Sequence, residues 1–260
     1  MRLGAGRTLR ATRTLSAGLV TTVALALGGS ALAIIGGSPD NGAHPYVGAA
    51  LQDQGGGTEL CSGFLLSPTV FVAAAHCFPD GSTVQITFDE NALESSNFIP
   101  GVVHTDPKFC FVCGHGVPNA DTNDLAVVVL STPVTLPRYA QLPKPGQSAT
   151  LPNNTPIDVV GYGIQAFDKN GKKAVPTAFG TRQAATTKAA SAGTLSPQFI
   201  KLLGGPGICQ GDSGGPNLIG GTDTVIAETS FTVGKPNCNG NSYSERIDTP
   251  EALAFISSFL

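Results

Sequence analysis

The chain has 260 residues, of which 41% are hydrophobic and 13% are charged, and its formal net charge at pH 7 is −3. Without the four arginines of the first 33 residues, 11 basic residues face 18 acidic ones, which is a net charge of −7. A mildly acidic chain with few lysines lacks the basic surface that nucleic acid requires, so no nucleic-acid partner is expected.

The first 33 residues differ from the rest and predict a secretory signal peptide. Arginines are their only charges, a largely apolar run follows from Leu15 to Leu27, and small residues end in Ala31-Leu32-Ala33. A basic start, an apolar core and an A-x-A site are the parts of such a signal. The apolar run is short for a membrane span of about 20 residues. We therefore expect a secreted protein that has no membrane attachment after cleavage and begins at Ile34.

Short apolar or alternating runs, separated by Gly, Pro, Asn or Asp, fill the remaining chain and predict an all-β fold. Helical runs long enough for parallel β-α-β units are missing between them. A proline-rich stretch from Pro137 to Pro156 divides the chain into halves that are each large enough for their own core. The candidate strands are residues 64–66, 84–88, 125–130, 157–160 and 225–231.

Residues 249–260 predict one terminal α-helix. Thr249 is a suitable N-cap, and Pro250 fits the first helical position. The face predicted to dock on the second half of the chain consists of Leu253, Ile256 and Leu260.

The six cysteines all follow residue 33, which suits an oxidising compartment and a disulfide framework. Their pairing stays open at the level of the sequence. Cys110 and Cys113 form a CxxC motif, which can be half of a zinc site, a redox pair or a small disulfide loop. A zinc site needs further ligands, and no second pair is evident. The Gly- and Pro-rich surroundings do not suggest the helix start of a redox motif, so the disulfide loop is favoured.

Ser213 lies in the run Gly211–Gly215 (GDSGG) and is a candidate nucleophile, which needs a base and an orienting acid. The same run fits the G-x-S-x-G elbow of α/β-hydrolases, whose histidine follows the serine along the chain. All four histidines precede Ser213, so that fold is excluded. His76 is the candidate base, because the unperturbed pKa of histidine, near 6.5, suits both acceptance and return of a proton.

Asp124 is the candidate acid that orients His76. It opens the apolar run 125–130, and a buried carboxylate at a strand start can hold the second imidazole nitrogen. Asp121 is the alternative acid, although a turn residue is its default role.

Taken together and in chain order, these motifs resemble those of secreted serine proteases of the chymotrypsin/trypsin family. The resemblance covers nearly all of residues 34–260. It implies two six-stranded antiparallel Greek-key β-barrels, residues 34–140 and 155–260, with the active site in the cleft between them and a C-terminal α-helix. The motifs are IIGG at 34–37, CSGFLLSP at 61–68, AAHC at 74–77, DLAV at 124–127, VGYG at 160–163 and CQGDSGGP at 209–216.

The resemblance also implies the chemistry, which is peptide-bond hydrolysis through a triad of His76, Asp124 and Ser213 and an acyl-enzyme intermediate. The backbone N–H groups of Gly211 and Ser213 would form the oxyanion hole. No cofactor and no metal are implied. Polypeptides would be the substrates, proteinaceous inhibitors are conceivable partners, and a monomer is expected.

Maturation is implied as well, because in this family the residue before the catalytic serine pairs with the new α-amino group of the mature chain. Asp212 and Ile34 hold these two positions. Since the predicted signal cut falls directly before Ile34, we expect signal removal itself to activate the enzyme, with no separate pro-peptide.

Specificity is less clearly encoded. The trypsin branch has an Asp six residues before the catalytic serine, where this chain has Gly207, so preference for Lys or Arg is not expected. The pocket segment corresponds to Ser230-Phe231-Thr232, in which Thr232 would narrow the mouth, and Gln210 belongs to the same implied substrate-binding set. Small or medium uncharged P1 residues are therefore expected. The absence of Trp is a departure from the family pattern.

The resemblance implies the disulfides Cys61–Cys77 and Cys209–Cys238, which leaves Cys110 for Cys113. We expect this last loop to shape the subsites just N-terminal to the scissile bond. Two alternative functions stay open: a catalytically silent, protease-like binding protein, and a secreted esterase that uses the same triad.

Overall fold

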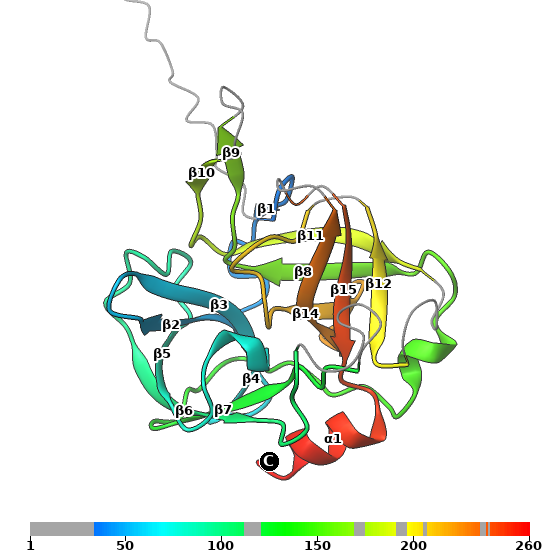
Figure 1. The fold of residues 1–260 in the computed structure, drawn as a ribbon, viewed down its shortest axis with the longest axis horizontal. Coiled ribbons are helices and arrows are strands. Elements are labelled where there is room, and N and C mark those ends of the chain that lie inside the picture. The colour runs from blue at the N-terminus through cyan, green and yellow to red at the C-terminus, as the bar shows by residue number, and fades with distance from the viewer. Residues whose placement is uncertain are drawn as a thin grey trace, which may run out of the picture.

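The computed structural model describes residues 34–111, 121–168, 175–190, 197–204, 207–234, 238 and 240–260. Within these residues the chain forms two antiparallel β-barrels side by side, with helix α1 (Pro250–Ser257) near the C-terminus (Figure 1). The prediction of an all-β fold with two six-stranded barrels and a terminal helix is confirmed. The predicted signal peptide, residues 1–33, and Cys113 lie outside the described residues.

Six strands close the first barrel in the order β2-β3-β4-β7-β6-β5. Its core is filled by fully buried side chains such as Phe64, Phe71 and Val127. Strand β4 is buried along its whole length and leads almost directly into the short 3-10 helix η1 (Ala75–Cys77). The strands are β2 (Val47–Asp53), β3 (Thr58–Leu65), β4 (Val70–Ala73), β5 (Thr83–Thr87), β6 (Ile99–Thr105) and β7 (Ala126–Leu130).

The second barrel has the strand order β11-β12-β15-β14-β13-β8, and pairing of β8 with β11 closes it. The connection from β7 contains the 3-10 helix η2 (Gln147–Thr150). Strand β1 (Ser38–Pro39) adds to β11, while β9 (Ala166–Asp168) and β10 (Val175–Ala178) form a separate hairpin. The barrel strands are β8 (Pro156–Gly161), β11 (Gln183–Ala189), β12 (Phe199–Leu203), β13 (Pro216–Ile219), β14 (Val225–Gly234) and β15 (Gly240–Arg246).

A buried arginine joins the two barrels. Arg182, just before β11, is 3% exposed, and its Nε lies 3.0 Å from Asp40 Oδ2. Its remaining N–H groups donate to the carbonyl oxygens of Val47 and Phe88 and to the carboxylate of Glu90. A buried guanidinium is costly unless it is fully paired, so this network constrains how the barrels meet.

Helix α1 starts as predicted, with Thr249 as its N-cap. Ile256 packs into a core cluster that contains residues of both barrels, such as Phe71 of the first and Leu218 of the second. The ring centroids of Phe259 and His104 on β6 lie 5.2 Å apart, so the helix also reaches the first barrel, which was not expected. Leu260 is 56% exposed, because the chain leaves the helix after residue 257 and the helical face does not continue. Among the described residues, no helix has the length and apolar character needed to cross a membrane.

Candidate active site

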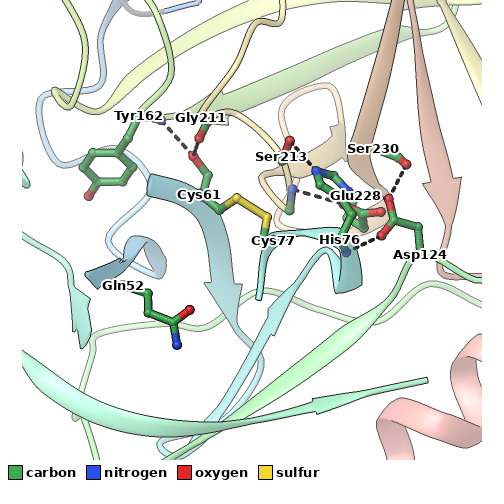
Figure 2. The surroundings of a disulfide bond; sticks show 12 residues. Gln52, Cys61, His76, Cys77, Asp124, Tyr162, Gly211, Ser213, Glu228 and Ser230 are labelled. Carbon is green, nitrogen blue, oxygen red and sulfur yellow. Dashed lines mark hydrogen bonds and ion pairs between the residues drawn. A yellow bond between two sulfur atoms is a disulfide. The ribbon is translucent and has the colours of Figure 1, made fainter. Parts of the chain in front are cut away.

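Helix η1 holds His76 at the edge of the first barrel. A disulfide between Cys77 and Cys61 on β3 ties this short helix to the barrel wall (Figure 2). The backbone N–H of His76 donates to Asp124 Oδ1 at 2.9 Å. The side chain is 25% exposed, so one side of the ring meets a buried carboxylate while the other is open to a substrate.

Asp124 is fully buried where the chain enters β7. Its Oδ2 lies 2.7 Å from His76 Nδ1 and accepts a hydrogen bond from Ser230 Oγ at 2.5 Å. A carboxylate that holds Nδ1 leaves Nε2 free to accept a proton. Asp121, the alternative acid, is exposed. Asp124 is therefore the acid that the fold brings to His76.

Ser213 comes from the second barrel and completes the row of contacts across the cleft. Its Oγ lies 3.0 Å from His76 Nε2 (Figure 2). The turn that carries it is tied down by the disulfide between Cys209 and Cys238. A hydroxyl within hydrogen-bond reach of an oriented imidazole is the arrangement that activates a serine nucleophile.

Gly211 begins the turn with a φ of 92°, which lies in the region that favours glycine. A Cβ there would also come within 2.8 Å of the Cα of Gly163. In the described part of the chain, neither the N–H of Gly211 nor that of Ser213 has a protein acceptor. Both donors are therefore available to an external oxygen, as an oxyanion hole requires.

Ser62 on β3 reaches from the first barrel to this turn and holds it twice. Its backbone N–H donates to the carbonyl of Ser213 at 2.8 Å, and its Oγ donates to the carbonyl of Gly211 at 2.8 Å. The same Oγ accepts from the N–H of Tyr162 at 2.9 Å. Ser62 therefore fixes the peptide groups that follow Gly211 and Ser213, and these adjoin the two peptide groups whose N–H donors form the candidate oxyanion hole.

Asp212 is buried, with 2% of its surface exposed. Its Oδ1 accepts from the N–H of Gly163 and its Oδ2 from the N–H of Cys209, both at 2.9 Å. Burial raises the pKa of Asp212 to about 7, against the lowering effect of these two hydrogen bonds. No ion pair of the described residues includes this carboxylate.

The expected mature start lies in the second barrel. Ile34 is 1% exposed and belongs to that barrel's core. Ile35 pairs with Gly207, with N···O distances of 3.0 and 2.8 Å in the two directions. The expected activation partners, Ile34 and Asp212, thus both lie buried in the same barrel.

A cavity of about 240 Å³ opens beside Ser213. Gln210, Ser230, Phe231 and Thr232 all line it, as the resemblance implies, whereas Gly207 pairs with Ile35 instead and is not part of this lining. Phe231 is stacked on Tyr243 with ring centroids 5.1 Å apart, which braces one wall. The lining also includes Ile208, Cys209 and Thr229.

Phe111 follows Cys110 and lies over the triad. Its ring centroid is 5.2 Å from that of His76 and 6.4 Å from that of Phe231, so it borders the cavity wall. Cys110 is disulfide-bonded, and Cys113 lies outside the described residues. The segment before Cys113 therefore reaches His76 through Phe111.

Comparison with known proteins gives the family. A family model described as trypsin matches residues 34–254. The chain belongs to the chymotrypsin/trypsin family. It is a serine-type endopeptidase, and proteins of this kind act on polypeptides.

Individual relatives of this protease are moderately similar in sequence. A trypsin from Phaedon cochleariae is 28% identical over 190 residues, covering 70% of this chain and 72% of the relative. Human chymotrypsin-like elastase family member 1 is 28% identical over 204 residues, with 73% and 77% coverage. Mouse serine protease 56 is 32% identical over 195 residues, which span 70% of this chain but only 31% of that protein. A solved HL collagenase structure shares the fold, with a TM-score of 0.68, 20% identity and coverage of 86% and 97%.

Four residues near the candidate site of this protease were not predicted from its sequence. Ser62 stands inside a quoted motif, yet its partner Gly211 is 149 residues away. Glu228 interrupts an apolar run, which is a visible signal for a special environment. The four are Ser62, Phe111, Glu228 and Glu245.

Proposed function

We propose that this serine protease hydrolyses peptide bonds through His76, Asp124 and Ser213 after secretion. The observation that carries the proposal is the unbroken row of contacts from Asp124 Oδ2 to His76 Nδ1, 2.7 Å, and from His76 Nε2 to Ser213 Oγ, 3.0 Å. Each of these residues is held by a different element, and the three meet between the barrels.

In the proposed first step, Ser213 Oγ forms a bond to the carbonyl carbon of the substrate while its proton moves to His76 Nε2. Asp124 stabilises the imidazolium that results. The carbonyl oxygen becomes an oxyanion and receives hydrogen bonds from the N–H groups of Gly211 and Ser213. Each such donor contributes about 3 kcal/mol to the transition state.

In the proposed second step, the C–N bond breaks and His76 returns the proton to the leaving amine, which leaves an acyl group on Ser213. Water then attacks the ester, again with His76 as base, and restores the free serine. Ser230, which donates to Asp124 Oδ2, helps to hold the carboxylate in place through both steps.

For the specificity pocket we propose the 240 Å³ cavity, with small or medium uncharged P1 residues as substrates. Among the lining residues that the structure describes none is charged, and an unpaired buried cation is costly. In matched peptides that differ only at P1, kcat/KM for Ala, Val or Leu should exceed that for Lys or Arg by at least about tenfold. Thr232→Gly should widen acceptance toward larger side chains. A preference for Lys or Arg would contradict this assignment.

We also propose that cleavage directly before Ile34 completes the enzyme. The new ammonium group would pair with the buried carboxylate of Asp212. This carboxylate already accepts from the N–H groups of Gly163 and Cys209, which holds the turn in place. Such a pair would fix the turn that carries both oxyanion donors. Secretion, action as a monomer and inhibition by proteins belong to the same proposal.

A covalent label tests the central role of Ser213. A diaryl phosphonate with a small uncharged P1 group should attach once per mature chain, on the peptide that contains Ser213, and abolish hydrolysis in proportion. His76→Ala should not be labelled, because its serine lacks a base. Absence of labelling in the wild type would favour the silent binding protein, and labelling with hydrolysis of esters but not of peptides would favour the esterase.

A further inference from the structure

Two glutamates lie directly behind the candidate triad, in the wall of the second barrel. Glu228 on β14 and Glu245 on β15 are cross-strand partners, so their side chains are neighbours on one face of the sheet. They are 0% and 4% exposed. If both side chains were ionised, two negative charges would face each other across the strands, which is unfavourable. Burial makes ionisation of both more costly still.

Their contacts connect them to the catalytic groups. Glu228 Oε2 accepts from the N–H of Gly214, the residue after Ser213, at 3.1 Å (Figure 2). Glu245 Oε2 accepts from Thr122 Oγ1 at 3.0 Å. Glu228 Oε1 is a buried oxygen without a hydrogen-bond partner in the described part of the chain.

The surroundings of the pair are acidic. Asp124 and Asp121 face the two glutamates from the segment before β7. His76 contacts Asp124, which lies between it and the pair. Arg246, next to Glu245 along β15, pairs with Asp248 at 2.8 Å instead. Burial first, and then the charge of Asp124, raise the pKa of Glu228 well above its usual range and that of Glu245 to about 8.

We propose that Glu228 and Glu245 are protonated when the enzyme works, which leaves Asp124 as the single anion of this three-carboxyl cluster. Glu228 is then a positioning residue: its Oε2 shares the N–H of Gly214 with the carbonyl of Thr229, which lies at 2.7 Å, and its Oε1 carries the proton. This inference rests on the proposed triad and deepens it.

The assignment matters for His76, because negative charges beside Asp124 favour the imidazolium. An ionised glutamate at either position would stabilise the imidazolium, so a smaller share of His76 would be neutral and able to take the proton of Ser213. Two neutral acids supply the hydrogen bonds of the wall without that charge. The two glutamates can therefore support the turn that carries Ser213 without adding negative charge beside Asp124 and His76.

The test is the pH profile of kcat/KM for Glu228→Gln and Glu245→Gln. An amide is neutral and nearly the same shape, so it imitates a protonated carboxyl group. We expect the midpoint of the acid limb to stay within about 0.2 pH units of wild type for each variant, since no charge near His76 is lost. The plateau for Glu228→Gln should stay within about twofold of wild type, because the amide oxygen can accept from the N–H of Gly214 as the protonated carboxyl group does.

A fall of the midpoint by about one pH unit in either variant would overturn the proposal, because it would mean that an ionised neighbour was removed. Glu94→Gln, at an exposed site, is the matched control. Ser213→Ala must abolish the wild-type profile, since persistence of activity there would sink the proposed function rather than this inference. Glu245→Gln keeps the test decisive if Glu228→Gln does not fold.

Thermal stability gives a second readout on the same variants. A native pKa raised above the unfolded value means that the native state keeps a proton that the unfolded chain has released. The contribution of Glu245 to stability should therefore be fully present below the ordinary glutamate pKa and should be lost as pH rises to about 8. The Tm advantage of Glu245→Gln should grow over that window, and a difference that does not vary with pH would contradict the assignment.

Discussion

Replacement of Ser213 by alanine is expected to lower kcat/KM for peptide hydrolysis by about four to six orders of magnitude. The hydroxyl lies 3.0 Å from His76 Nε2, and no other described hydroxyl contacts that nitrogen in the structure. Without it, only transition-state binding by the oxyanion donors and the substrate cleft remains. The measurement is the initial rate on a peptide with a small uncharged P1 residue, with wild-type enzyme calibrated by active-site titration.

Folding is not expected to explain the loss, because Ser213 Oγ makes its one described contact with His76. Ser96→Ala, at an exposed site, should behave as wild type and serves as the matched control. The far-ultraviolet circular dichroism and Tm of Ser213→Ala should match those of the wild type. Retention of more than about 1% of the activity would show that another residue is the nucleophile.

The sequence was most informative where a function needs several residues that are neighbours in the chain. The turn around Ser213 carries the serine, an oxyanion glycine and Asp212 within three positions, and η1 places His76 next to its disulfide. Short strands between Gly and Pro turns were equally predictable, and each of the five predicted runs lies on a strand or extends beyond it by a single residue. Residues that are neighbours in the chain are also neighbours in the fold, so these local patterns identified the barrels and the candidate residues.

Contacts between distant segments were not readable. Ser62 meets the carbonyl of Gly211 only because the two barrels close on each other, and Glu228 meets Glu245 only through the register of β14 with β15. Counting back from Ser213 along the chain identified Gly207 but not its neighbours. Its backbone pairs with Ile35, and it is not among the residues that line the cavity.

Asp212→Asn is expected to lower kcat/KM by about two to three orders of magnitude, as loss of an oxyanion donor does. The carboxylate accepts two backbone N–H groups, one on each oxygen, in a fully buried site. An asparagine has only one acceptor oxygen, so its amide N–H would face either Cys209 N–H or Gly163 N–H. Two buried N–H donors that face each other destabilise the folded variant by about 1–3 kcal/mol. The turn can separate these donors only by moving.

Movement of this turn would displace the N–H groups of Gly211 and Ser213, so the loss should appear mainly in kcat. The amide would also be a neutral partner for the proposed ammonium of Ile34. Asp53→Asn, at the exposed end of β2, is the matched control and should retain wild-type rates. N-terminal sequencing should find Ile34 first in the secreted wild-type enzyme. Wild-type rates for Asp212→Asn, or an active enzyme that begins upstream of Ile34, would mean that the buried carboxylate does not couple maturation to the oxyanion hole.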